Sequence, residues 1–424
     1  MQRRYPAAPS SRSLASQINA GETSARQAIQ DTLARIEERD GELQSFVAVE
    51  AAAAIAAADE VDRLIASGER LPLAGVPFGV KELIAVAGFP QGYGTTAMPR
   101  LAAVEDAHCV RRLRAAGAIP VGMTRTSELA WRDDTPPTLN PLDPALSCGG
   151  SSGGSGVAVA AGLVPFALGT DTGGSVRVPA ALCGCCGHKP TFNLVPTTGV
   201  LPVSPSLDHV GVLAASVQDV RLVLDVFSDA RVTRAGDAGS MALRIGVSLG
   251  LTECDWLLEG LRRSDAELVP VEMSSLAAGY NVVNTVSLVE GARIFEAALA
   301  APADALSVVS RSELALAVSL DAKVLSDALR MGETIRAEMD ALFAREELDA
   351  IVLEALSGPA PRRDRPAAQL NWPLPLANVT GQPSCVVPVR RRPLPVAVQI
   401  LGRRGEDERV LNVAATIEAL AQVA

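Results

Sequence analysis

Two glycine-rich loops containing serine decide the fold of this chain: Gly149-Gly-Ser151-Ser-Gly-Gly-Ser155 and Gly169-Thr-Asp-Thr-Gly-Gly-Ser175. A third segment, Gly75-Val-Pro-Phe-Gly-Val-Lys81, precedes both loops and reads as an apolar strand that ends in a lysine. The run from Val157 to Leu168 is apolar throughout and predicts a buried helix that leads into a strand. Short apolar runs that alternate with helical patterns are typical of an α/β fold.

Further elements follow from capping residues and apolar periodicity. Ser24 and Gln27 form a capping box that predicts a helix ending near Gly41, and a second, alanine-rich helix is expected to follow. The alanine-rich helix covers 51–66, and further expected helices cover 106–116 and much of 290–345. The remaining expected strands cover 118–122, 243–247, 350–353, 385–387 and 395–400.

A glycine-rich loop with serines has three common uses, and two of them fit this sequence poorly. Phosphate binding needs a lysine or a strand-loop spacing that residues 149–156 lack. The stretch from Gly149 to Gly153 does match G-x-S-x-G, which would make Ser151 the nucleophile of an α/β-hydrolase with a later histidine. However, only two of the chain's three histidines, His188 and His209, follow Ser175, and His209 directly follows Asp208. The histidine that such a nucleophile needs is therefore scarce here.

The third use is an oxyanion hole beside a nucleophilic serine. Backbone N–H groups of Thr172, Gly173, Gly174 and Ser175 could converge there, because glycine permits the backbone angles that such a turn needs. The serine needs a base, and lysine is the remaining choice because histidine is scarce. Lys81 follows an apolar run that could desolvate it and keep it neutral, although an ion pair with the adjacent Glu82 would oppose this.

These three segments, in this order and spacing, resemble the amidase signature family, hydrolases that cut amide bonds with a Ser–Ser–Lys triad. The resemblance covers about residues 65–225 and returns at 371–410. It implies one α/β/α sandwich around a large mixed sheet, with Ser175 as nucleophile, Lys81 as base and Ser151 bridging them. It also implies a cis peptide bond between Gly150 and Ser151, an acyl-enzyme intermediate, and no metal or cofactor.

The resemblance leaves the substrate and the assembly open. Carbamates or esters could be cut by the same triad, and a glutaminase subunit of an amidotransferase, which needs a partner, is a further alternative. The region 225–345 is short and divergent for the family, which speaks against that subunit. We expect a small-molecule amide as substrate, no binding to nucleic acid or membrane, and leave a homodimer open.

Two sets of residues are candidates for binding substrate. Segments near 132–141 and 189–199 look closest to the compact, malonamidase-like branch, whose substrates carry a carboxylate that Arg132 or Arg177 could pair with. The arginine that this branch carries three residues after the nucleophile is Val178 here, which questions that specificity. Alternatively, apolar lining could come from three residues: Tyr93, Met98 and Trp131.

Length and composition bound the class of protein. The 424 residues suit one large α/β domain, which we divide into N-terminal helices (1–70), a catalytic core (71–225), a variable pocket region (226–365) and a C-terminal return to the core (366–424). A net charge of −10 argues against nonspecific nucleic-acid binding. The polar start of the chain shows no signal peptide, and no apolar stretch is long enough to span a bilayer.

The cysteines indicate a reducing compartment. There are seven, an odd number at irregular spacing, so reduced thiols in the cytoplasm are expected. The run Cys183-Gly-Cys185-Cys186-Gly-His188 looks like part of a metal site. It lacks a second pair of ligands at a suitable distance, so a buried turn is the preferred interpretation.

Overall fold

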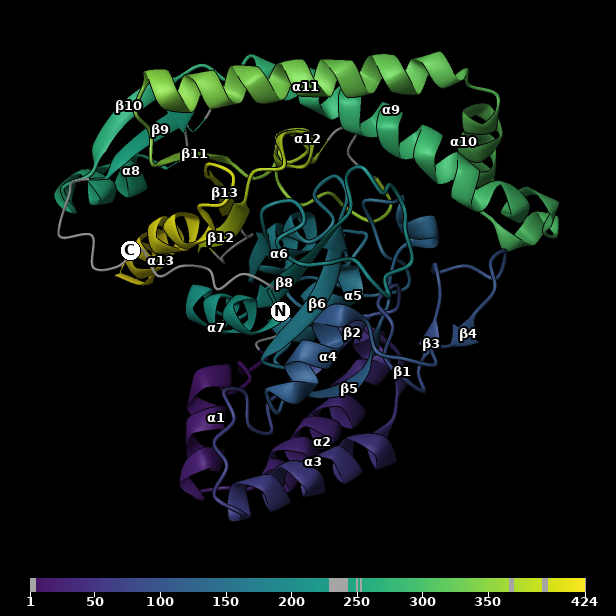
Figure 1. The fold of residues 1–424 in the computed structure, drawn as a ribbon, viewed down its shortest axis with the longest axis vertical. Helices are drawn as coiled ribbons and strands as arrows, with labels where there is room; N and C mark the ends of the chain where they lie inside the picture. The colour runs from purple at the N-terminus through teal and green to yellow at the C-terminus, as the bar shows by residue number, and fades with distance from the viewer. Residues whose placement is uncertain are drawn as a thin grey trace.

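The computed structural model describes residues 5–228, 243–248, 251, 254–365, 370–390 and 396–423, and centres on a mixed sheet of eleven strands (Figure 1). The strand order is β1-β5-β2-β6-β8-β7-β12-β13-β11-β9-β10, and β3 and β4 form a separate hairpin-like pair. The central strands β5, β2 and β6 are parallel, and so are β11, β9 and β10, whereas the other neighbours are antiparallel. The α/β prediction is thereby confirmed.

The elements have the following bounds. The strands are β1 Phe46–Val49, β2 Pro77–Lys81, β3 Pro90–Gln91, β4 Leu101–Ala102, β5 Ile119–Thr124, β6 Phe166–Asp171, β7 Cys186–Lys189, β8 His209–Ala214, β9 Arg244–Ser248, β10 Glu267–Val271, β11 Ala350–Glu354, β12 Ser384–Arg390 and β13 Val396–Leu401. The α-helices are α1 Ser11–Ala20, α2 Ala25–Leu43, α3 Ala51–Ala66, α4 His108–Ala115, α5 Gly153–Ala160, α6 Arg177–Cys183, α7 Val217–Phe227, α8 Asp255–Arg263, α9 Ser275–Phe295, α10 Val308–Val318, α11 Ala322–Arg345, α12 Leu376–Thr380 and α13 Asp407–Val423.

Helices cover both faces of the sheet. One apolar cluster joins one face to α4, α7, α8 and α13, and a second joins the other face to α2, α3, α5 and α6. Alternate residues of one strand divide between them: Phe166 and Leu168 of β6 belong to the first cluster and Ala167 to the second. This period of two is what a strand buried on both faces requires.

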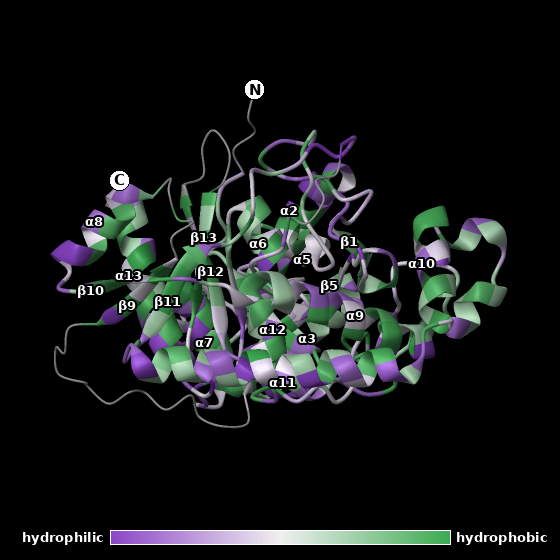
Figure 2. Ribbon diagram, turned by 90° about the horizontal axis from the view of Figure 1, so that it is seen from above, coloured by the Kyte–Doolittle hydropathy of each residue, from purple (hydrophilic) through white to green (hydrophobic). Residues whose placement is uncertain are grey.

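In a further group of helices, α9 to α11, the helices α9 and α11 pack against α12 and the β11 part of the sheet. In Figure 1, α11 and α9 span the molecule on the side opposite α1, α2 and α3. Figure 2 shows hydrophobic and hydrophilic residues alternating along α11, as expected for a helix with one buried side. Its apolar residues pack with α9, α12 and β11 in a third cluster.

Strands from all four predicted segments join the one sheet. The segment 1–70, predicted as helical, also contains β1, which pairs with β5 at the sheet edge. The predicted helix end at Gly41 was wrong by a few residues, because the helix continues to Leu43 and Gln44 takes the left-handed conformation at φ 53°. Ser24 caps this helix as expected, accepting a hydrogen bond from the Gln27 N–H. Within the described residues, no helix is both long and apolar enough to cross a membrane.

Candidate active site

Lys81 lies at the end of β2, fully buried between two hydroxyl groups. Strand β2 runs parallel to β6, so the carboxyl ends of both strands meet at the same edge of the sheet. The Nζ atom of Lys81 is 2.7 Å from Ser151 Oγ and 2.8 Å from Thr170 Oγ1, near the end of β6. The adjacent Glu82 accepts from the Thr126 N–H and lies 3.7 Å from Arg100, rather than forming an ion pair with Lys81.

The environment of Lys81 favours a neutral amine. Burial is the largest effect and lowers its pKa from 10.5 to about 7, although the carboxylates of Asp171, Asp208 and Glu82 act in the opposite direction. A substantial fraction of Lys81 is therefore neutral near pH 7. A neutral amine has a lone pair that can accept the proton of the Ser151 hydroxyl while an N–H still donates to Thr170.

Ser151 is held just before α5 by its backbone. The Gly150–Ser151 peptide bond is cis, as the family resemblance implied. The Ser151 carbonyl accepts from the N–H of Ser127 at 3.1 Å and from the hydroxyl of Thr126 at 3.1 Å. A side chain at Gly150 would place its Cβ 2.2 Å from the Arg132 carbonyl oxygen, so only glycine fits here.

Ser175 lies in a loop, residues 172–176, that follows β6 and leads into α6. Unlike Lys81 and Ser151, Ser175 is partly exposed. Its carbonyl accepts from the Ser152 N–H at 3.1 Å, which fixes this loop beside the residue that follows Ser151. The three predicted triad residues thus come from three separate segments that the fold brings together.

A buried acid holds this loop from behind. The carboxylate of Asp171 accepts hydrogen bonds from the N–H groups of Gly174 at 2.8 Å and Val176 at 3.1 Å. Arg177 forms a two-pronged ion pair with the same carboxylate, at 3.0 and 2.9 Å. Burial alone would raise the pKa of Asp171, but Arg177 and the amide of Asn378 outweigh burial and keep this pKa well below its usual range.

This arrangement bears on the predicted oxyanion hole, which stays a prediction. The Gly174 N–H donates to Asp171 in this structure, whereas the other three predicted donors do not. Within the described part of the chain, the N–H groups of Thr172, Gly173 and Ser175 have no hydrogen-bond acceptor. Gly174 instead supplies the turn, since its φ of 117° is unfavourable for other residues.

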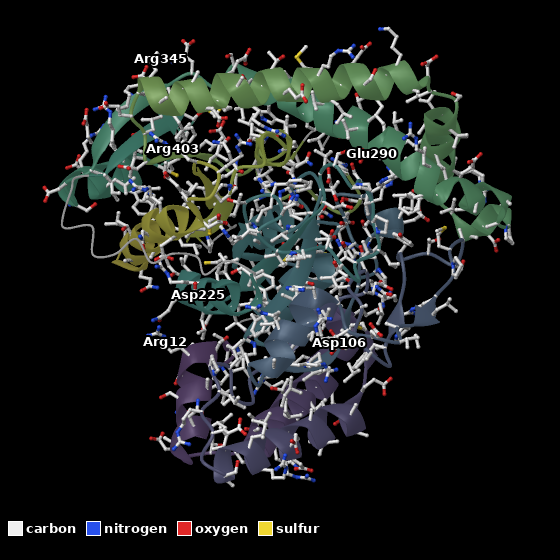
Figure 3. The ribbon with its side chains drawn as sticks, in the orientation of Figure 1. Arg12, Asp106, Asp225, Glu290, Arg345 and Arg403 are labelled. Atoms are coloured by element: carbon white, nitrogen blue, oxygen red, sulfur yellow. The ribbon has the colours of Figure 1, made fainter. Side chains whose placement is uncertain are left out.

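A second acid, the half-buried Asp208, connects the loop to α9 through Ser204. Asp208 accepts from the Thr172 hydroxyl at 2.7 Å and from the N–H groups of Val203 and Ser204 at 2.8 and 3.0 Å. Burial raises the pKa of Asp208 to about 6, and the nearby charge of Glu290 acts in the same direction. Glu290, labelled on α9 in Figure 3, accepts from the hydroxyl of Ser204 at 2.6 Å.

The predicted substrate-binding arginines are both paired with protein groups. Arg177 is fully buried, and beyond Asp171 it donates to the Leu374 carbonyl, Gln399 and Asn378. The prediction that it meets a substrate carboxylate does not fit this burial. Arg132 pairs with Glu313 of α10, with Nη2 and Oε2 2.6 Å apart, and remains partly exposed.

The predicted apolar lining belongs to a packed cluster with α9 and α10. Tyr93 is 5% exposed, and its hydroxyl donates to the Pro202 carbonyl at 3.0 Å. The rings of Tyr93 and Trp131 both meet Phe295 edge to face, with centroids 4.9 and 5.2 Å apart, and Met98 packs against the same cluster. Tyr93 therefore packs within this cluster, and pocket lining by Tyr93, Trp131 and Met98 stays a prediction.

The histidine relay of an α/β-hydrolase does not form around Ser151. The described residues between β5 and α5 contain no strand, so the strand-turn-helix that carries such a nucleophile is missing there. His209 is buried, and its Nδ1 lies 2.7 Å from the Leu207 carbonyl oxygen. Burial lowers the pKa of His209 well below its ordinary value, and the hydroxyl of Ser151 meets Lys81 instead.

The cysteine run forms part of the core. Its thiols are buried, and Cys183 donates to the Cys148 carbonyl at 3.3 Å. Burial also raises the pKa of the thiol of Cys148, the neighbour of Cys183 outside this run, to about 12. Among the described residues, no group of three or more His, Cys, Asp or Glu side chains is arranged to hold a metal ion.

Two residues near these loops were missed by the sequence analysis. Thr170 contacts Lys81. Its position in the sequence, one residue before Asp171 in an apolar run, could have indicated that it lies near the site. Asn371 donates from Nδ2 to the Gly173 carbonyl at 3.2 Å. No local pattern marks Asn371, because its partner is almost two hundred residues away in sequence.

Residues 27–411 match the Amidase family. Mandelamide hydrolase of Pseudomonas putida is 32% identical, over 93% of this chain and 88% of its own length. A glutamyl-tRNA(Gln) amidotransferase subunit from Deinococcus radiodurans is also 32% identical, over 97% of each chain. The corresponding protein of Chromohalobacter salexigens is 42% identical, but this match spans only 45% of that protein and 51% of this chain.

Solved structures agree with the sequence relatives. The native peptide amidase of Stenotrophomonas maltophilia superposes with a TM-score of 0.85 at 29% identity, over 97% of each chain. A structure described as an amidase gives a TM-score of 0.87 at 31% identity, over 97% of this chain and 99% of that one. The sandwich fold and the family resemblance are therefore confirmed, and the chain belongs to the amidase (amidase signature) family of amide-hydrolysing enzymes.

Proposed function

We propose that this enzyme hydrolyses small amides through an acyl-enzyme on Ser175. Neutral Lys81 accepts the proton of Ser151, Ser151 accepts that of Ser175, and Ser175 Oγ bonds to the amide carbon. The N–H groups of Thr172, Gly173 and Ser175 stabilise the oxyanion. The proton then returns through Ser151 to the departing nitrogen as the C–N bond breaks. Water, deprotonated along the same route, adds to the acyl-enzyme and releases the acid and Ser175.

The observation that carries this proposal is the buried Lys81–Ser151 contact. Nζ and Oγ are 2.7 Å apart, within reach for proton transfer, and the pKa of Lys81 is lowered to about 7. A lysine serving only as a positive charge would gain nothing from such burial, whereas a base must be neutral to act. Metal-independent catalysis in the cytoplasm is part of the same proposal.

Relatives narrow the substrate class. The name of one relative matched over 88% of its length, mandelamide hydrolase, is that of an enzyme acting on mandelamide, an uncharged amide. The pairing of Arg132 with Glu313 leaves little positive charge for a substrate carboxylate, so we favour a neutral amide over a malonamate-like one. Carbamates and esters are weaker candidates that the same acyl-enzyme chemistry would accept.

The test is release of ammonia or amine by the purified chain, with covalent labelling by a fluorophosphonate. Ser175→Ala should abolish both turnover and labelling, while Ser67→Ala, an exposed serine at the end of α3, should change neither. Lys81→Ala should reduce turnover by several powers of ten. Labelling that persists in Ser175→Ala would place the nucleophile elsewhere.

A second candidate is the catalytic subunit of an amidotransferase, because several relatives are such subunits. That function requires a partner and takes ammonia from glutamine. The substrate panel should therefore include glutamine, mandelamide, malonamate, aliphatic and aryl amides and an aryl carbamate. Turnover of a simple amide by the chain alone favours the first function, whereas glutamine hydrolysis that appears only with a co-purified partner favours the second. Light scattering of the same sample tests for a homodimer.

A further inference from the structure

Asp133 carries a carboxylate that no described residue engages. The residue is exposed, whereas its neighbours Arg132 and Asp134 are partly covered. Both neighbours have partners: Arg132 pairs with Glu313 of α10, and Asp134 accepts from the Ser147 hydroxyl at 2.6 Å. Within the part of the chain that the structure describes, the Asp133 carboxylate accepts no hydrogen bond and forms no ion pair. It is therefore free to bind a group from outside the protein.

The surroundings of Asp133 form a recess. Solvent reaches this residue, yet the protein around it desolvates the carboxylate and raises its pKa to about 6, and the nearby charge of Arg132 only partly opposes this. A carboxylate on an open surface keeps its hydration and an ordinary pKa. A carboxylate that is both accessible and poorly hydrated lies in a recess, where its charge is less screened and attracts a cation more strongly.

The backbone of Asp133 is held against the peptide bond before Ser151. A Cβ at Gly150 would lie 2.2 Å from the Arg132 carbonyl oxygen and 3.0 Å from the Asp133 carbonyl carbon, so the two segments touch here. In the proposed reaction Ser151 passes a proton between Ser175 and the departing nitrogen. A bound amide therefore lies next to Ser151 and close to Asp133.

Helix α9 gives the scale of the space between Asp133 and the Ser175 loop. A Cβ at Gly173 would lie 2.9 Å from Val283 Cγ1, and one at Gly291 would lie 2.4 Å from Trp131 Cζ2. Val283 and Gly291 are eight residues apart on α9, which is about 12 Å along its axis. Asp133, two residues after Trp131, is thus within reach of the far end of a small amide whose carbonyl lies at Gly173.

The positive charge nearest to this recess is already paired. Arg132 donates through Nη1 and Nη2 to Glu313 at 3.1 and 2.6 Å, and through Nε to Ser310 at 3.2 Å, so its guanidinium is held on α10. The recess beside Ser151 therefore keeps the negative charge of Asp133. That charge repels a substrate carboxylate and attracts a substrate ammonium.

We propose that Asp133 binds a cationic amine of the substrate and selects amides that carry one. The scissile amide group itself is neutral, and the positive charge lies on another group of the same molecule. The inference rests on the proposed function, since it assumes that Ser175 attacks an amide. It deepens that function, because the triad alone does not distinguish a cationic amide from a neutral one of the same shape.

The experiment compares amides that differ only in this charge. One series carries it on the acyl side: 5-aminopentanamide is compared with hexanamide, which has a methyl group in place of the ammonium. The other carries it on the departing amine: N-(4-aminobutyl)acetamide is compared with N-pentylacetamide. Homologues with shorter and longer chains extend both series. In at least one series, the native enzyme should show a kcat/KM about 10-fold higher for the cationic member of a pair.

Asp133→Asn keeps the size of the side chain and removes its charge. It should bring the ratio of kcat/KM within the preferred pair close to one, by slowing the cationic member more than the neutral one. Damage to the packing against Gly150 would instead slow both members equally and leave the ratio unchanged. Asp133→Lys should reverse the ratio, so that the neutral member is preferred. Glu22→Gln, at an exposed acid in the turn between α1 and α2, removes a charge elsewhere and should preserve the native ratio.

The outcomes separate this proposal from the proposed function. A native ratio near one in both series, or a ratio that survives in Asp133→Asn, overturns the role of Asp133. If the fluorophosphonate labels Ser175 but none of these amides is hydrolysed, protection from labelling decides. Pentylamine, which is cationic, should then protect Ser175 better than pentanol, and Asp133→Asn should remove the difference; equal protection overturns the role while the serine chemistry stands. Absence of both labelling and turnover removes the proposed function itself, and the role of Asp133 with it.

Discussion

The chemistry of the site depends on what burial does to Lys81. Three carboxylates influence this residue, yet none of them pairs with it directly: Asp171 is bonded to Arg177, Asp208 to Thr172, and Glu82 to the Thr126 N–H. Their charges partly counter desolvation and leave the pKa at about 7. Activity should therefore rise with pH through this region, because only the neutral amine can act as a base.

Glu82→Gln tests this electrostatic balance. Gln keeps an oxygen that can accept from the Thr126 N–H, but it removes one negative charge that raises the pKa of Lys81. The acidic limb of the pH profile of kcat/KM should shift to lower pH, by up to about one pH unit. Glu60→Gln, at an exposed ion pair on α3, is the control and should leave the limb in place. A limb that stays fixed or moves to higher pH in Glu82→Gln would contradict Lys81 as the titrating base.

Single residues also show what the sequence could and could not predict. Lys81, Ser151 and Ser175 stand in short motifs, and the order and spacing of these motifs, through the family resemblance, marked them as candidates. Arg177 lies in the same motif, but its burial depends on Gln399 and Asn378, which only the fold brings near. The commitment of the Gly174 N–H to Asp171 is likewise a matter of loop geometry that composition does not reveal.

At the scale of elements, α5 shows why a glycine-rich run can be a helix. The apolar pattern predicted a helix from Val157, yet α5 begins at Gly153. Glycine is a poor helix former, so helix propensity does not predict the first turn of α5. The structure explains its use here: a Cβ at Gly154 would lie 2.4 Å from the backbone N of Arg125, and one at Gly156 would lie 2.8 Å from Pro179. Close packing of α5 outweighs its propensity.

Paired glycine substitutions test this explanation. Gly154→Ala should destabilise the protein by about 1–3 kcal/mol and lower activity, because the new methyl group meets backbone that cannot move aside and α5 follows Ser151 directly. Gly41→Ala is the matched control: it lies in α2, where a Cβ would meet nothing within 4 Å. It should stabilise the protein by about 0.5–1 kcal/mol. Thermal unfolding midpoints measure both; equal shifts would show that packing does not dictate the glycines of α5.

In the molecule as a whole, residues 226–365 join the core through both strands and helices. The strands β9 and β11 extend the sheet, as their apolar runs predicted, and β10, which the sequence analysis did not predict, pairs with β9. The helices α9 to α11 attach through contacts that no periodicity identifies, among them Phe295 against Tyr93 and Trp131. Val283 of α9 also closes over Gly173, so the attachment of these helices bears on the site itself.

Truncating Phe295 should therefore affect both stability and catalysis. Phe295→Ala removes a fully buried ring from the cluster that joins α9 to the core and should cost about 3–5 kcal/mol. Because α9 carries Val283 over the Ser175 loop, kcat/KM should also fall at temperatures well below unfolding. Leu316→Ser, on α10 and 62% exposed, is the control and should change stability by less than about 0.5 kcal/mol. A Phe295→Ala enzyme that is destabilised yet fully active would mean that the site keeps its shape without the α9 attachment, and that the signature core alone positions Ser175.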